Sequence, residues 1–183
     1  LVGSEMCIRD RSYYYWWLGY HYLNRRSFVR FNISIPSGAT IVSARLRLYM
    51  DQNPGQNRTY QVWRVVQNWS EGSIRWNNQP SVAGSATASL NIGTSTGWKE
   101  WDVTSDVQAF YSGSAPNYGW MIRDASENSG TSRQARFRAS EYSGTSYDPR
   151  LIIVYNRPPS SPALVSPTNG AYTNDNTPYL DWN

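Results

Sequence analysis

The stretch that decides the fold is IVSARLRLYM, residues 41–50, in which apolar and polar side chains alternate. Successive side chains of a strand point to opposite faces of a sheet, so a period of two indicates a strand with one buried and one wet face. The residues expected to face the core are Val42, Ala44, Leu46, Leu48 and Met50. The residues expected to face outward are Ser43, Arg45, Arg47 and Tyr49.

Similar short runs lie on both sides of this strand, separated by turns rich in Gly, Pro and Ser. They are residues 27–33, 59–66, 74–76, 98–103, 119–123, 133–139 and 151–155. Many short strands at such spacing are typical of sandwiches and jelly rolls. One helix is expected, from a cap at Thr104 or Ser105 to a stop at Gly113. We predict an all-β, jelly-roll-like β-sandwich with one short helix, followed by a linker and a truncated second β domain.

The ends of the chain differ from this module. Residues 1–11, LVGSEMCIRDR, lack alternation and resemble translated sequencing adapter, which is common at the broken ends of metagenomic genes, so we treat them as a non-native leader. The module is then residues 12–156. Prolines make residues 157–162 a stiff linker. Residues 163–183 resemble the start of a bacterial immunoglobulin-like or fibronectin-like repeat.

Composition narrows the class of protein. Of the 183 residues, 16% are charged and 15% aromatic, a balance typical of secreted or cell-surface β modules. No apolar stretch is long enough to predict membrane insertion. The 17 cationic residues include a single lysine, Lys99. Since arginine pairs with carboxylate or sulfate through two parallel hydrogen bonds, the bias indicates either an acidic ligand or the codon usage of a GC-rich genome.

Several segments in order resemble one family. They are residues 28–33, 35–49, 65–71, 74–80, 101–104, 117–119 and 149–155. Across roughly residues 24–156 the chain is similar to the DNRLRE-type modules, treated as a carbohydrate-binding module family. The resemblance implies a β-sandwich that occurs beside polysaccharide lyases and adhesins and, where a role is assigned, binds acidic polysaccharide such as alginate. The chain departs from the family at its start, where aromatic residues 13–17 replace an extended first strand.

The candidate ligand-binding residues are outward arginines and aromatic residues expected to be exposed. They are Arg30, Arg45, Arg47, Arg136, Arg138, Tyr49, Trp120 and Tyr142. If the strands that carry the four central arginines share a sheet, their guanidinium groups form a basic stripe suited to a polymer with repeating charges. The alternative is a solvated face with salt bridges to Glu71, Glu100 or Glu141. Trp69, Trp76 and Trp101 are expected in the core.

Metal binding and catalysis have weaker support in the sequence. Asp124 and Glu127 share a loop with oxygen ligands of the kind calcium takes, but an ordinary polar turn is the simpler reading, so no cofactor is expected. The single histidine, His21, and the lack of a Gly-x-Ser-x-Gly elbow argue against an enzyme. Glu100 and Asp102 share a strand face, yet Asp102 is better explained as a cap before the helix.

We therefore expect a non-catalytic module of a secreted multidomain protein that binds acidic polysaccharide through an arginine-rich sheet face. Its expected neighbours are immunoglobulin-like and catalytic domains. The alternatives are a structural spacer or adhesin domain of a bacterial surface protein and, with less support, a small polysaccharide lyase. Nucleic acid is not expected as a partner, because the aromatic residues follow strand cores and no RNA-binding motif occurs.

Overall fold

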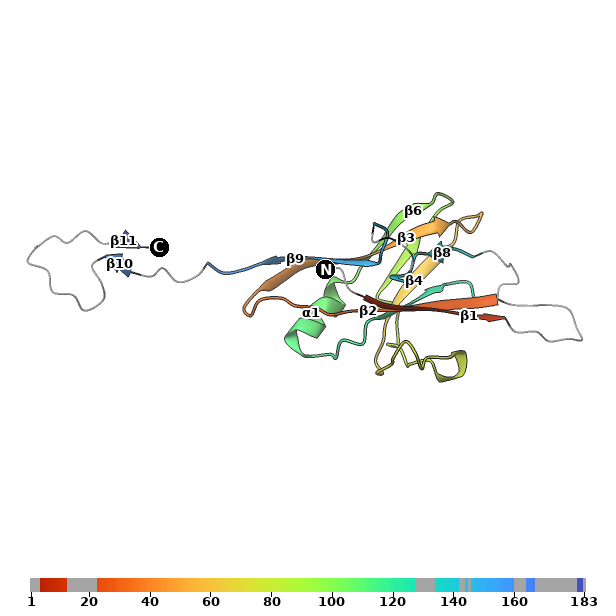
Figure 1. Ribbon diagram of the computed structural model, residues 1–183, viewed down its shortest axis with the longest axis horizontal. Coiled ribbons are helices and arrows are strands. Elements are labelled where there is room, and N and C mark those ends of the chain that lie inside the picture. Colours follow the sequence, from red (N-terminus) through yellow and green to blue (C-terminus); the bar gives the residue numbers. More distant parts are fainter. Residues whose placement is uncertain are drawn as a thin grey trace, which may run out of the picture.

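The computed structural model describes residues 4–12, 23–127, 134–141, 144, 146–159, 164–166 and 181–182. Two antiparallel sheets form a sandwich, with one short helix at one end (Figure 1). The first sheet has the strand order β1-β2-β7-β4-β5, and the second has the order β6-β3-β8 with β9 also paired to β3. The sandwich elements are β1 (Ser4–Ser12), β2 (Leu23–Phe31), β3 (Thr40–Gln52), β4 (Thr59–Arg64), η1 (Trp76–Asn78), β5 (Ala88–Asn91), β6 (Gly97–Asp102), α1 (Thr104–Ser112), β7 (Trp120–Asp124), β8 (Arg136–Phe137) and β9 (Arg150–Asn156). The prediction of an all-β sandwich with a short helix is confirmed.

Strand β3 is the centre of the second sheet and follows the predicted alternation over most of its length. Its side chains from Ala44 to Met50 alternate between buried and outward positions as expected. The prediction is wrong at Val42, which is 53% exposed, while Ile41 is buried. The pairing of β3 with β9 shifts register between Ile41 and Ser43. Because a β-bulge inserts one extra residue, it exchanges the two faces of the strand at that point.

The core lies between the two sheets and contains two fully buried indoles. Trp101 donates its indole N–H to the carbonyl oxygen of Tyr60 at 3.0 Å, and Trp120 donates to the carboxylate of Asp106 at 2.8 Å. Buried polar groups that find partners avoid a desolvation penalty, so these rings fill the core without an unpaired donor. The expected core position of Trp101 is confirmed.

A second apolar cluster covers the outer face of the first sheet. Phe28 of β2 and Met121 of β7 pack there beneath Trp69 and Ile74 from the segment after β4. The indole of Trp69 donates to the carbonyl oxygen of Tyr118 at 2.8 Å, which fixes the segment to the sheet. The core position expected for Trp69 is confirmed, although in this satellite cluster.

The segment 74–76 is not the predicted strand. It leads into the 3-10 turn η1, and the side chain of Asn78 both donates to the carbonyl of Ser73 at 3.0 Å and accepts the main-chain N–H of Arg75. The isolated apolar residue that suggested a strand, Ile74, serves to anchor the loop on the second cluster. Trp76, also expected in the core, is half-buried.

Residues 4–12 form strand β1, where no element was expected. It pairs antiparallel with β2 from Ser4 opposite Phe31 to Ser12 opposite Leu23. Without β1, strand β2 would be an edge with unpaired main-chain groups, and any extended segment can pair with such an edge whatever its side chains. Side-chain alternation therefore could not predict this strand.

The tail has its own small sheet. Strands β10 (Leu164–Ser166) and β11 (Asp181–Trp182) pair antiparallel and lie apart from the sandwich in Figure 1. Of the predicted linker, residues 157–159 are described and follow β9. Within the described part of the chain, no helix has the length and apolar character needed to cross a membrane.

Helix α1 begins beside a carboxylate that accepts two hydrogen bonds. Asp102 accepts the main-chain N–H of Thr104 at 3.0 Å and its hydroxyl at 2.6 Å. These hydrogen bonds lower the pKa of Asp102 below its ordinary value, with a smaller contribution from the charge of Arg45. The helix ends at Gly113, in the left-handed conformation with φ 74°.

We expect Asp102→Ala to destabilise the protein by about 1 kcal/mol at pH 7, as for loss of a helix cap. Since the folded-state pKa is lowered, the stabilisation is present above the unfolded pKa of about 3.9 and disappears as the pH falls through the folded value. Urea unfolding of both proteins at pH 7 and pH 3 measures this. An equal difference at the two pH values would contradict the assignment.

Candidate functional site

The outward arginines of β3 lie opposite acids of β6. The strand register pairs Arg45 with Asp102 and Arg47 with Glu100, and the nitrogen–oxygen distances are 3.1 Å and 2.7 Å. The outward orientation predicted for these two arginines is therefore correct. The alternative prediction, a solvated face with salt bridges, also fits here, because Glu100 is one of the acids that it named. Exposed pairs contribute at most about 1 kcal/mol each, so they leave these guanidinium groups open to a competing anion.

Three aromatic rings gather on the same outer face. The ring centroids of Tyr49 and Trp98 are 5.5 Å apart with planes at 81°, and those of Tyr49 and Tyr147 are 4.1 Å apart. Tyr147 is 43% exposed, and the other two rings are half-buried. Edge-to-face and offset contacts of this kind hold rings in defined orientations.

Guanidinium groups lie against these rings. The Cζ atoms of Arg47 and Arg150 are each 4.9 Å from the centroid of Trp98, and that of Arg138 is 5.5 Å from the centroid of Tyr147. Arg150 comes from β9, two strands away from β6, so these contacts extend across the whole width of the sheet. We call this surface the aromatic–arginine face and define it by its six side chains, Tyr49, Trp98, Tyr147, Arg47, Arg138 and Arg150.

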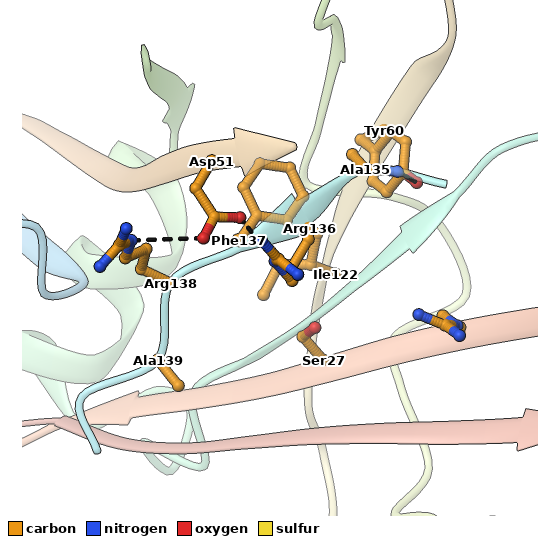
Figure 2. A pocket seen from close by; sticks show the side chains of 10 residues that line it. Ser27, Asp51, Tyr60, Ile122, Ala135, Arg136, Phe137, Arg138 and Ala139 are labelled. Carbon is orange, nitrogen blue, oxygen red and sulfur yellow. Dashed lines mark hydrogen bonds and ion pairs between the residues drawn. The ribbon is translucent and has the colours of Figure 1, made fainter. Parts of the chain in front are cut away.

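The other two predicted arginines of the stripe gather around one carboxylate. Strand β8 pairs with β3, so the four arginines do lie in one sheet. Arg136 and Arg138, however, both direct their Nε atoms to Asp51, at 2.8 Å and 3.3 Å (Figure 2). Their position is beside a cavity rather than in line with Arg45 and Arg47.

That cavity has a volume of about 300 Å³ and lies between the two sheets. Ser27 of β2 and Ile122 of β7 line one side, and Arg136 and Phe137 of β8 line the other (Figure 2). No pattern in the sequence predicted this cavity, because the residues that form it are far apart along the chain.

Two predicted ligand-binding residues lie elsewhere, and a third falls outside the described part of the chain. Arg30 is on the first sheet, 5.3 Å from the ring centroid of Trp69 and 3.2 Å from the side-chain oxygen of Asn68. Trp120 is fully buried, so its selection as an exposed ring was wrong: it lies on the inward face of β7. Tyr142 lies outside the described residues.

Trp98, Tyr147 and Arg150 were not among the predicted ligand-binding residues. The outward position of Trp98 was predictable. Trp101 faces the core, so alternation along β6 puts residues 98, 100 and 102 together on the outward face. Tyr147 precedes β9 in a turn and has no periodic signal.

The loop acids considered for calcium are held by arginines. Glu127 accepts two hydrogen bonds from Arg26, at 2.8 Å and 2.7 Å, and lies 3.7 Å from Arg123. Asp124 pairs with Arg58 and accepts the main-chain N–H of Ser126 at 2.8 Å. Among the described residues, no group of three or more His, Cys, Asp or Glu side chains is placed to hold a metal.

We expect the melting temperature to stay unchanged when EDTA is added to protein kept in calcium, because guanidinium groups already neutralise both carboxylates. A calcium ion present at 100 times its Kd would add roughly 2.7 kcal/mol of stability. A fall of several degrees on chelation, reversed by added calcium, would therefore contradict the expectation.

Partly exposed aromatic rings on one outer face of a two-sheet β-sandwich are an arrangement that is able to bind a ligand. The model of carbohydrate-binding module family 96 matches residues 16–155, and the chain belongs to this family. None of the curated proteins matches the chain. Membership makes carbohydrate the class of ligand, and it confirms the prediction of a carbohydrate-binding module.

Proposed function

We propose that this module binds acidic polysaccharide through the aromatic–arginine face, without catalysing a reaction itself. The observation that carries the proposal is the placement of Arg47 and Arg150, each 4.9 Å from the ring centroid of Trp98. A sugar ring has an apolar C–H face that can pack on an aromatic ring. A uronate or sulfated sugar adds an anion, which a guanidinium group binds with two parallel hydrogen bonds.

The charges around this face favour an anionic ligand. Arg47 is paired with Glu100, but that carboxylate is 47% exposed and the pair is weak. Arg150 donates to the main-chain carbonyl of Ser146 at 2.8 Å, and in the described part of the chain no carboxylate pairs with it. Beside the ring, an arriving carboxylate therefore meets one cation in a weak ion pair and one that donates to a main-chain carbonyl.

The wider context is also part of the proposal. The similarity to DNRLRE-type modules supports alginate or a related polyuronate as the ligand, and a secreted or cell-surface multidomain protein as the parent. A structural spacer or adhesin domain is the second candidate, supported by the proline-rich segment after β9 and the β10–β11 hairpin. In that case the arginines and acids of the second sheet would be a solvated face.

The test compares two tryptophan variants in affinity electrophoresis on alginate. Trp98→Ala is expected to weaken binding roughly tenfold or more, as for truncation of an aromatic residue central to an interface. Trp63→Ala is the matched control, since Trp63 is a half-buried ring 4.3 Å from the Cζ atom of Arg123, but on the first sheet. It should bind like the wild type.

Salt provides an independent arm of the same test. Retention of the wild type should fall as sodium chloride is raised towards 1 M, because screening weakens contacts between exposed charges. Equal retention of Trp98→Ala and wild type would refute the aromatic–arginine face as the binding surface. Retention that stays the same as the sodium chloride concentration rises would refute an acidic ligand.

A further inference from the structure

The outer face of the second sheet carries exposed aliphatic side chains where β3 runs beside β9 (Figure 1). Val42 of β3 is exposed, and so are Ile152 and Val154 of β9. Ile153 packs against the core, so its two neighbours along β9 point outward. We call Val42, Ile152 and Val154 the aliphatic patch. Single exposed aliphatic side chains are ordinary, but a contiguous group of them commonly marks a surface that binds a partner or ligand.

The aliphatic patch continues the aromatic–arginine face along the same two strands. Successive outward pairs of the register lead from one to the other: Arg47 opposite Arg150, Arg45 opposite Ile152, and Ser43 opposite Val154. Two residues of a strand span about 6.7 Å, so the patch begins about 7 Å from the first of these pairs. A polymer that lies on the aromatic–arginine face and follows the strands therefore reaches the patch.

One hydroxyl group lies among the aliphatic side chains. Ile41 and Ala44 are buried, so the bulge between Ile41 and Ser43 leaves the side chains of both Val42 and Ser43 on the outer side. Within the described part of the chain, no hydrogen bond joins the Ser43 hydroxyl to another group. The hydroxyl can therefore donate to an acceptor on a ligand.

We propose that the aliphatic patch binds the acyl groups of an O-acylated acidic polysaccharide, with acetyl esters as the simplest case. The inference rests on the proposed function for the place and the class of the polymer. An acetyl ester has a methyl group, which packs on aliphatic side chains, and a carbonyl oxygen, which accepts from the Ser43 hydroxyl. A free sugar hydroxyl at the same place loses water against apolar side chains, which is unfavourable. The module therefore binds the esterified polymer more tightly than the unesterified one.

The experiment compares two ligands of equal length and charge by isothermal titration calorimetry with the wild-type chain. One is an alginate oligosaccharide, and the other is the same oligosaccharide after partial chemical O-acetylation. Esterification of the hydroxyl groups leaves every carboxylate in place, so the electrostatic contribution to binding is unchanged. We expect the acetylated ligand to bind roughly fourfold more tightly, the value for burial of one methyl group. Equal affinity, or tighter binding of the unmodified ligand, overturns the proposal.

Two variants locate the preference on the aliphatic patch. Val154→Ser and Ser43→Ala should each reduce the preference for the acetylated ligand to less than twofold and leave the affinity for the unmodified ligand unchanged. Val66→Ser is the matched control, because Val66 is 41% exposed, close to the 50% of Val154, but follows β4 of the first sheet. It should keep the preference. Trp98→Ala should weaken binding of both ligands by the same factor. A preference that persists in both patch variants overturns the proposal.

The remaining outcomes separate this proposal from the proposed function and from self-association. Wild-type protein that binds neither ligand removes the proposed function and this inference together, whereas binding of both with equal affinity removes this inference alone. A second copy of the chain is the other occupant that an exposed aliphatic surface could have. Sedimentation equilibrium should show a monomer for both the wild type and Val154→Ser. A wild-type dimer that Val154→Ser dissociates overturns the proposal in favour of a contact between copies.

Discussion

Gly119→Ala is expected to destabilise the protein by about 3 kcal/mol or more and to lower its melting temperature by roughly 10 °C. Gly119 has φ 74°, and a Cβ atom there would lie 2.1 Å from the carbonyl oxygen of Val29 and 2.8 Å from the Cα of Arg30. Those atoms belong to the main chain of β2, so the clash cannot be relieved by a side-chain rotation. Relief requires β2 and β7 to separate at the centre of the first sheet.

Gly113→Ala is the matched control for this effect. Gly113 has the same φ of 74°, but a Cβ atom there would meet nothing within 4 Å. The substitution should therefore show only the backbone cost of a left-handed residue, about 1 kcal/mol. Thermal unfolding of both variants measures the difference, and equal costs for the two glycines would contradict the close approach of β7 to β2.

Asp106→Ala is expected to destabilise the protein by roughly 3 kcal/mol. Asp106 lies on α1 and is 7% exposed. Its carboxylate accepts the indole N–H of Trp120 at 2.8 Å and the hydroxyl of Thr87 at 2.6 Å, and it pairs with Arg64 at 3.2 Å. Removal leaves a buried indole donor without its acceptor, which costs about 1–3 kcal/mol by itself.

Asp106→Asn tests which part of this network matters. The amide oxygen can still accept from the Trp120 indole, while the ion pair with Arg64 is lost. We expect about half the cost of the alanine variant in urea unfolding at pH 7. An alanine variant within 1 kcal/mol of the wild type would show that α1 is not held to the sheet through this carboxylate.

The fold was predictable from the sequence because one face of nearly every strand is buried. The alternation in β3 from Ala44 to Met50 directly follows from its position in the sandwich. The error at Val42 arose because a bulge exchanges faces without any change in composition. Strand β5 was missed because its residues, Ala88–Asn91, are small or polar on the outer side and its pairing with β4 uses the main chain.

The candidate site was predictable only in part. The two-residue period of β3 correctly predicted that Arg45, Arg47 and Tyr49 face outward. This prediction needs no knowledge of the neighbouring strands. The contact of Trp98 with Arg150 depends on which strands flank β3, and that order cannot be obtained from the periodicity of any one strand. Trp120 was misplaced for a related reason: two consecutive apolar residues, Trp120 and Met121, are both buried because both faces of the first sheet are covered.

The location of the ligand is the central claim, and a titration of 15N-labelled protein with an alginate oligosaccharide tests it most directly. The indole N–H resonance of Trp98 should shift with saturation, together with main-chain resonances of β3, β6 and β9. The indole resonances of Trp63, on the opposite face, and of buried Trp101 should stay in place. Shifts confined to Trp63 and the first sheet, or no shifts at saturating oligosaccharide, would contradict binding on the aromatic–arginine face.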